Sequence, residues 1–343
     1  MNRVNQKIID AVIEKAKKCC PDSLALIAVY GSVATGEEHE KSDLDLLILI
    51  EDEQGKKLAS GFLLDDRKVG YDIYCTDWNS LCYDAECYHA QISKLMDSEI
   101  VYVKKQEAYE QLLQLRKKAE QFLKSEERFQ RVDELLQKAK QAYANACLYD
   151  DLGQVRVEAL GVLHYLMNAL MIYHGRYFKR GVKKTFEELA VLPLDDKFAN
   201  NVQKLVLSKE IAQLRELLKT LLLYAEQHMH REKKKAEPSD LLVGTYEEMY
   251  SNWRNKMEEA AANDDAFSSY MNLCNLQFML IGLSDEFDIG SYRLMDEYNP
   301  DSLEDNVRVF DHALQKYEAI YQRAGISVKR FKNVDEFVAD YLH

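Results

Sequence analysis

The segment LALIAVYGSVATGEEHEKSDLDLLILI, residues 24–50, decides the architecture of the N-terminal part of the chain. It contains two apolar runs, residues 24–30 and 44–50, and the first of them ends at Gly31-Ser32. Runs of about seven mostly apolar residues without a helical stripe are typical of strands that are buried on both faces. We therefore predict two buried strands that are joined by a Gly-Ser turn and a polar connection.

The residues around this segment predict a small mixed sheet with flanking helices. Apolar residues at helical spacing predict an amphipathic helix over residues 4–19. Residues 69–75 predict a third, weaker strand, residues 76–96 are expected to be helical, and residues 98–104 are a candidate for a further short strand. From about residue 106 the pattern changes to long helices. The predicted fold class is α+β, with a small N-terminal mixed sheet followed by an all-α helical-bundle region.

The helical part divides at a charged segment. Residues 155–175 are apolar nearly all round, which predicts the central helix of a bundle, and further helices fit 183–191 and 195–230. Residues 230–240 are charged and contain a proline, so they are either a linker or the solvated end of one helix and the start of the next. We predict three domains, over residues 1–105, 106–235 and 236–343.

Composition restricts the partners and the location of the protein. The net charge of −13 disfavours nucleic acid as a partner, because phosphate binding needs clustered Lys and Arg. Seven cysteines without a CxxC pair are typical of reduced thiols. The N-terminus lacks a signal-peptide pattern, and no run reaches the roughly 18 apolar residues of a membrane span. We therefore expect a cytoplasmic protein with no membrane partner.

The polar connection carries the candidate chemistry. A Gly31-Ser32 turn after a buried strand lets the backbone approach a phosphate, because glycine has no Cβ, and the Ser32 hydroxyl can add a hydrogen bond. Asp43 and Asp45 are two residues apart at the start of a strand, so their side chains face the same way. Two neighbouring carboxylates are costly without a cation between them, and Mg²⁺ prefers such oxygen ligands.

A third carboxylate is expected on a neighbouring strand. Asp72 is placed for this role, while Asp65, Asp66 and Asp77 are competitors nearby. Three carboxylates can hold two metal ions, which stabilise the attacking and the leaving oxygen in phosphoryl or nucleotidyl transfer. The predicted metal ligands and catalytic residues are therefore Asp43, Asp45 and Asp72, with two Mg²⁺ ions.

Six residues carry a resemblance to a known family: Gly31, Ser32, Gly36, Ser42, Asp43 and Asp45. Their order and spacing resemble the nucleotidyltransferase superfamily of the polymerase-beta type, and most closely the antibiotic nucleotidyltransferases that act on aminoglycosides and lincosamides. The resemblance implies a nucleotidyltransferase catalytic domain over residues 1–105, which binds ATP or another nucleoside triphosphate between Gly31-Ser32 and the metals. A hydroxyl of a small acceptor, an aminoglycoside-like antibiotic as the leading class, would attack the α-phosphorus, and pyrophosphate would leave.

The helical part offers further candidates for this reaction. Glu158 is a candidate general base because related enzymes can supply a glutamate from the helical half, although a helix-surface glutamate is the alternative. Asp72 could serve as the base as well as bind metal. Lys179 and Arg180, together with Lys183 and Lys184, form a basic cluster that either contacts the triphosphate or is a solvated helix end. The resemblance also suggests a homodimer.

Two other functions compete with this prediction. A nucleotidyltransferase of this kind could act in a regulatory or toxin–antitoxin system on a protein or RNA partner. The helical toxins of such systems carry an Arg followed by four to six residues and a His, and the absence of that spacing here disfavours a fused toxin. A nucleotide-binding protein without chemistry is the third possibility, against which the intact Asp43 and Asp45 argue.

Overall fold

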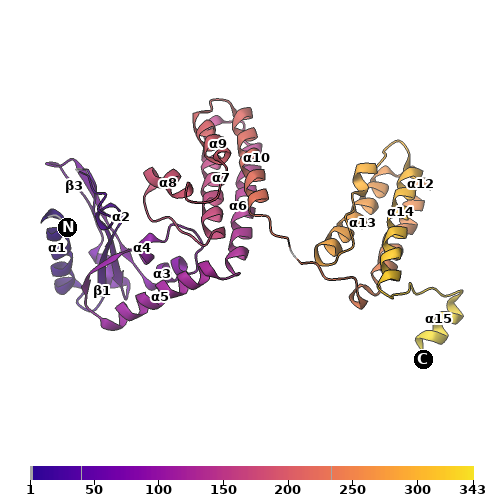
Figure 1. Ribbon diagram of the computed structural model, residues 1–343, viewed down its shortest axis with the longest axis horizontal. Coiled ribbons are helices and arrows are strands. Elements are labelled where there is room, and N and C mark those ends of the chain that lie inside the picture. Colours follow the sequence, from indigo (N-terminus) through magenta and orange to yellow (C-terminus); the bar gives the residue numbers. More distant parts are fainter. Residues whose placement is uncertain (1–2, 40, 233) are drawn as a thin grey trace. The chain divides into compact units, whose positions relative to one another are not determined.

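The computed structural model describes residues 3–39, 41–232 and 234–343, and it divides into two compact units, residues 1–230 and 231–343 (Figure 1). The strands all lie in the first unit: β1 (Leu24–Tyr30), β2 (Asp45–Ile50), β3 (Ser60–Leu64), β4 (Val69–Ile73), β5 (Cys75–Thr76) and β6 (Glu99–Val103). Its helices are α1 (Arg3–Cys19), α2 (Gly31–Ala34), η1 (Glu53–Leu58), α3 (Trp78–Ala85), α4 (Ser93–Met96), α5 (Gln106–Lys124), α6 (Arg128–Leu148), α7 (Leu152–Tyr173), η2 (Val182–Lys184), α8 (Thr185–Leu189), α9 (Asp196–Leu207) and α10 (Ile211–His228).

The second unit is largely helical in its described residues. Its elements are η3 (Asp240–Leu242), α11 (Thr245–Met249), the π-helix η4 (Tyr250–Arg254), α12 (Asn255–Ala262), α13 (Ala266–Glu286), η5 (Leu294–Glu297), α14 (Leu303–Arg323) and α15 (Val334–Tyr341). The α+β fold class predicted from the sequence is confirmed, with a small sheet and its helices followed by a largely helical region. The proposed boundary near residue 105 stays a prediction.

The central sheet explains the two apolar runs. Its strand order is β5-β2-β1-β6, with β2 and β5 parallel and the other pairs antiparallel, so the sheet is mixed. Along β2, Ile48 and Ile50 belong to the core that contains α1, whereas Leu47 and Leu49 belong to the core that contains α5. Both faces of the strand are therefore buried after Asp45, and the positions from Leu46 to Ile50 are all apolar.

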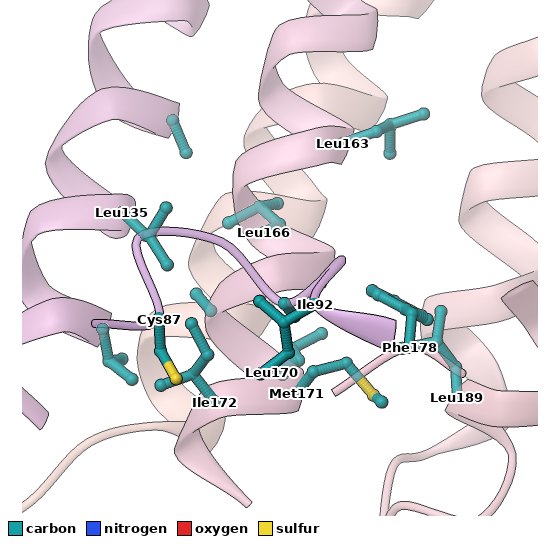
Figure 2. Close-up of a cluster of buried hydrophobic side chains, with 14 of the residues drawn as sticks. Cys87, Ile92, Leu135, Leu163, Leu166, Leu170, Met171, Ile172, Phe178 and Leu189 are labelled. Carbon is teal, nitrogen blue, oxygen red and sulfur yellow. The ribbon is translucent and has the colours of Figure 1, made fainter. Parts of the chain in front are cut away.

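One continuous apolar core joins the sheet to the helices of the first unit. It runs from β1 and β2 through α5 to α6, α7, α9 and α10. Figure 2 shows part of it, where Cys87 and Ile92 lie with Leu166 and Leu170 of α7. This shared core places the segment that follows α7 and the loop after β1 in one folded body, which matters for the site described below.

Helix α7 lies at the centre of this bundle, as the apolar stretch predicts. It packs against α6 and α10. By length and composition alone it is the one helix of the described chain that could cross a membrane, but half of its most apolar window is buried inside the protein. Such burial is typical of the core helix of a folded domain.

Three sequence predictions need correction. The predicted strand over 69–75 is two strands, β4 and β5, and β4 pairs with a strand that we did not predict, β3, in a separate two-stranded sheet. The helix expected over 76–96 is interrupted between α3 and α4, where the backbone N–H of Ala90 donates to the Asn168 side chain of α7. The helix expected over 195–230 breaks at Ser208, whose hydroxyl accepts from the Glu210 N–H and so competes with the helical pattern.

Candidate functional site

The turn after β1 brings the backbone against a carboxylate. Gly31 begins the one-turn helix α2 and has φ = +68°, in the left-handed region that favours glycine. A Cβ on Gly31 would lie 2.0 Å from Oδ2 of Asp45, so no larger residue fits without moving that side chain. The Thr35 hydroxyl donates to the Gly31 carbonyl oxygen over 3.2 Å and closes the turn. Gly31 and the Asp45 side chain are therefore in close contact.

Asp43 and Asp45, which we call the carboxylate pair, lie at the N-terminal end of β2. Asp45 is the first residue of the strand and pairs with Tyr30 of β1, while Asp43 lies in the extended segment before it and is exposed. Burial, and then the charge of Asp43, raise the pKa of Asp45 from 3.8 to about 6. The pair therefore has a net unfavourable interaction when both groups are ionised, which a divalent cation would relieve.

The raised pKa of Asp45, caused by burial and then by the charge of Asp43, predicts a pH-dependent stability in the metal-free protein. Because the folded-state pKa of Asp45 is raised, its ionisation destabilises the folded state as the pH increases from about 4 to about 6, and the full loss is present above that range. Asp45→Asn removes the titrating group. We expect the melting temperature of the variant, measured in EDTA, to exceed that of the wild type by about 2–6 °C more at pH 7.5 than at pH 4.5.

The control for this measurement is Asp65→Asn, which removes one exposed carboxylate from the turn after β3 without touching the carboxylate pair. Its difference in melting temperature from the wild type should be the same at both pH values. Equal behaviour of Asp45→Asn and Asp65→Asn would contradict the raised pKa of Asp45 in the folded protein.

Asp72 lies near Asp43, but the carboxylates of the described residues do not form a closed metal-binding cluster. It lies on β4, is exposed, and lines an open pocket of about 400 Å³ together with Asp43, Gly61 and Gly70. Within residues 3–39, 41–232 and 234–343, no three His, Cys, Asp or Glu side chains converge closely enough to hold a metal ion. The structure thus brings Asp72 beside Asp43 without completing the predicted three-carboxylate arrangement.

The competing carboxylates have other positions. Asp77 is the N-cap of α3 and accepts from the Ser80 N–H over 2.8 Å, which commits it to the helix end. Asp65 and Asp66 lie in the turn between β3 and β4, beyond the strand residues that line the pocket with Asp43. Asp43 and Asp72 line one pocket, and Asp45 lies next to Asp43 at the start of β2, so these three carboxylates are the oxygen ligands that the site offers to a divalent cation.

Two tyrosines at the carboxylate pair were not predicted from the sequence. The hydroxyl groups of Tyr30 and Tyr74 are 2.5 Å apart and form a hydrogen bond. Burial, the bond to Tyr74, and the charges of Asp45 and Asp43 raise the pKa of Tyr30 well above its ordinary value. With 21 tyrosines in the chain, only the register of β1 with β2 distinguishes this one.

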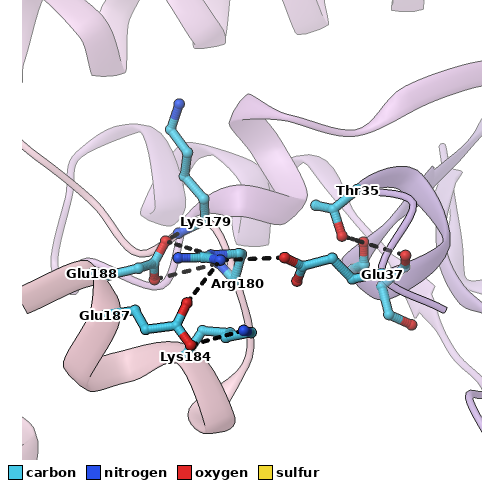
Figure 3. Close-up of polar contacts among 9 residues, drawn as sticks. Thr35, Glu37, Lys179, Arg180, Lys184, Glu187 and Glu188 are labelled. Carbon is cyan, nitrogen blue, oxygen red and sulfur yellow. Dashed lines mark hydrogen bonds and ion pairs between the residues drawn. The ribbon is translucent and has the colours of Figure 1, made fainter. Parts of the chain in front are cut away.

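The basic residues after α7 lie near the Gly-Ser loop. Arg180 forms ion pairs with Glu37, Glu187 and the buried Glu188, and the backbone N–H groups of Lys179 and Arg180 donate to the Glu188 carboxylate (Figure 3). Arg180 therefore has its charge balanced by three carboxylates and connects the helical part to the loop after α2. Lys179 is exposed, and its ammonium group lies 5.6 Å from the Tyr177 ring centroid.

A cavity beside these residues connects the two parts of the site. It has a volume of about 360 Å³ and is lined by Thr35 of the Gly-Ser loop, by Met171 at the end of α7, and by Lys179 and Arg180. Arg180 also lines an adjoining apolar groove of about 630 Å³ between α7, α8 and α9. The predicted nucleotide-binding residues Lys179 and Arg180 are thus near the motif, although neither lines the pocket of Asp43 and Asp72.

Glu158 is placed away from the carboxylate pair. It lies near the start of α7, where the Asn145 amide of α6 donates to its Oε2 over 3.4 Å. About 20 Å of helix separate it from Met171, the residue of α7 that lines the cavity with Thr35. The geometry supports the alternative that we gave for Glu158, a glutamate on the helix surface.

Comparison with known protein families agrees with this geometry. Residues 6–140 match the nucleotidyltransferase domain family. No curated protein matches the chain. Among solved structures, a nucleotidyltransferase-like protein from Exiguobacterium sibiricum 255-15 is similar at 16% identity, over 82% of this chain and 92% of that chain, with a TM-score of 0.36. The matched residues include the Gly-Ser turn, the carboxylate pair and Asp72, so the N-terminal part of the chain contains a nucleotidyltransferase domain and the protein is a nucleotidyltransferase enzyme.

Proposed function

We propose that the protein transfers AMP from ATP to a hydroxyl group of a small molecule, in a reaction that depends on Mg²⁺. The observation that carries this proposal is the contact between Gly31 and Asp45, which places a phosphate-binding turn beside the carboxylate pair. Asp43, Asp45 and Asp72 would hold the metal, two ions by the family resemblance. Bound Mg²⁺ supplies charge neutralisation to the attacking and leaving oxygens.

The chain's own residues position the reacting groups. Gly31 and Ser32 hold the triphosphate through backbone N–H groups and the Ser32 hydroxyl. The acceptor oxygen forms a bond to the α-phosphorus, the bond from that phosphorus to the bridging oxygen breaks, and pyrophosphate leaves. We assign the proton of the acceptor hydroxyl to Asp72, because this carboxylate is exposed in the pocket that it shares with Asp43. Lys179 would approach the triphosphate from the cavity that contains Thr35.

An aminoglycoside-like antibiotic is the acceptor class that we propose. The net charge of −13 would steer a polycation toward the protein, and the open pocket with Asp43 and Asp72 presents negative charge. The apolar groove between α7, α8 and α9 offers room for the rest of an acceptor. We further propose that the enzyme works in the cytoplasm as a homodimer, which sedimentation of the purified chain would test.

The direct test measures pyrophosphate release from ATP with Mg²⁺ and a panel of aminoglycosides and lincosamides. We expect release with at least one acceptor, and a product whose mass increases by that of one adenylyl group. Binding of ATP, detected as a rise in melting temperature, without turnover of any acceptor would contradict the antibiotic class. Turnover that persists in EDTA would contradict the dependence on metal.

A further inference from the structure

The chain passes from the β3–β4 hairpin to the central sheet at one residue. β4 ends at Ile73, β5 begins at Cys75, and Tyr74 lies between them. β5 pairs with β2 in the central sheet, where Ile48 is opposite Cys75, whereas β3 and β4 pair with each other in a separate sheet. The hairpin therefore shares no backbone ladder with the strand that carries Asp45.

The Tyr30–Tyr74 hydrogen bond crosses this gap between the two sheets. Tyr30 is directly opposite Asp45 in the register of β1 with β2. Tyr74 follows Asp72 by two residues, and both side chains are exposed, on the side opposite the buried Ile73. The hydrogen bond of 2.5 Å between the two hydroxyls thus connects the residue opposite Asp45 to a residue two positions after Asp72.

We propose that Tyr30 and Tyr74 are positioning residues, which hold the hairpin and its Asp72 beside the carboxylate pair. This role rests on the proposed function for its catalytic consequence. The hydrogen bond ties Tyr74, which follows Asp72 by two residues, to the residue opposite Asp45, and so restrains where Asp72 lies. Neither tyrosine needs to touch a substrate.

Other contacts keep the hairpin folded when this bond is removed. Val69, Tyr71 and Ile73 are buried in the core that contains α1, and the rings of Phe62 and Tyr71 stack with centroids 5.2 Å apart. Tyr→Phe changes preserve the aromatic rings of Tyr30 and Tyr74 and remove only the hydroxyls. The variants should therefore loosen the hairpin without unfolding it.

The first experiment is amide hydrogen exchange of the full chain without metal or nucleotide. In Tyr30→Phe and in Tyr74→Phe, the amides of residues 60–73 should exchange about three- to tenfold faster, as expected when one hydrogen bond that restrains a local opening is lost. The matched control is Tyr83→Phe, because Tyr83 is exposed on α3 and stacks on Tyr88 away from the hairpin. Hairpin exchange that is unchanged in both variants would overturn the proposal.

The second experiment asks whether the tyrosines act through Asp72. MnCl₂ should raise the melting temperature of the wild type, and this rise should be smaller in Tyr74→Phe and in Asp72→Asn. In the variant that combines Tyr74→Phe with Asp72→Asn, the rise in melting temperature with MnCl₂ should be no smaller than in Asp72→Asn alone. The effects of two residues that act through the same group are not additive. Additive losses would overturn the role assigned to Asp72.

The two measurements separate this inference from the proposed function. If wild-type protein releases no pyrophosphate but the tyrosine variants still loosen the hairpin and reduce the Mn²⁺ effect, the proposed reaction fails and the positioning role stands. If pyrophosphate is released normally and the hairpin does not respond to either tyrosine, the positioning role fails and the proposed reaction stands. Absence of any Mn²⁺ effect in the wild type contradicts the link to metal.

Discussion

Pyrophosphate release from ATP should fall by about 10³-fold or more when Asp45 is replaced by Asn, with no loss of stability at neutral pH. The amide has nearly the shape of the carboxylate, so it can occupy the same space beside Gly31. It cannot neutralise a divalent cation, and it no longer repels Asp43. Loss of activity together with unchanged or increased stability is the signature of a charge that is kept for function.

Asp43→Asn should behave similarly, while Asp65→Asn should retain wild-type turnover because Asp65 lies in the turn between β3 and β4. The measurement is steady-state turnover with Mg²⁺, ATP and the acceptor found in the panel, together with melting curves of each variant. Turnover that survives in both Asp43→Asn and Asp45→Asn would contradict the assignment of the carboxylate pair as metal ligands.

Gly31→Ala should reduce both stability and activity. The positive φ alone costs an alanine about 1–2 kcal/mol, and the added Cβ would also lie 2.0 Å from Asp45 Oδ2. The Asp45 side chain must therefore move, and a displacement of about 1 Å at a reacting centre can cost about 10²-fold in rate. We expect a loss of about 2–4 kcal/mol in the free energy of unfolding. We also expect turnover to fall by about 10²-fold or more.

Gly36→Ala is the matched control for this prediction. Gly36 has φ = +70°, close to that of Gly31, but a Cβ on Gly36 would meet no atom within 4 Å. It should show only the backbone cost of about 1–2 kcal/mol and little loss of turnover. Denaturant unfolding and turnover should be measured for both variants. The difference between them isolates the effect of the contact with Asp45 from the cost of the positive φ. Equal effects in both glycines would contradict the role of the contact with Asp45.

Much of the site could be predicted because it depends on local sequence. The glycine at position 31, and the spacing of Asp43 and Asp45 at the start of a strand, are consequences of backbone geometry over a few residues. The apolar runs that became β1 and β2 were evident for the same reason, since both faces of each strand are buried. These features need no knowledge of which distant residues approach them.

The hairpin was harder to predict. Residues 60–64 read Ser-Gly-Phe-Leu-Leu, so in the sequence β3 shows neither a long apolar run nor an alternation of apolar and polar residues. A strand of this kind is stabilised by pairing with β4 rather than by its own pattern. The position of Asp72 depends on that pairing. The sequence therefore suggested Asp72 as a ligand but did not determine where it lies.

Contacts between residues far apart in the chain determine where the other candidate site residues lie. Arg180 lies more than a hundred positions after Glu37, and its ion pair with that residue became visible only when α7 and its following segment packed near the Gly-Ser loop. Glu158 fits a catalytic role by residue type alone, and the direction of α7 places it far from the loop. Residue type does not contain this information, because helix direction is set by the packing of the whole bundle.

The sequence by itself determined the buried strands, the Gly-Ser turn, the carboxylate pair and the change to a helical region, since each follows from local backbone preference and apolar periodicity. Only the tertiary structure decided which residues join that turn: the hairpin with Asp72, the hydrogen-bonded Tyr30 and Tyr74, and Arg180 with its three carboxylates. Their approach results from strand pairing and core packing between segments far apart in the chain, which no local pattern encodes.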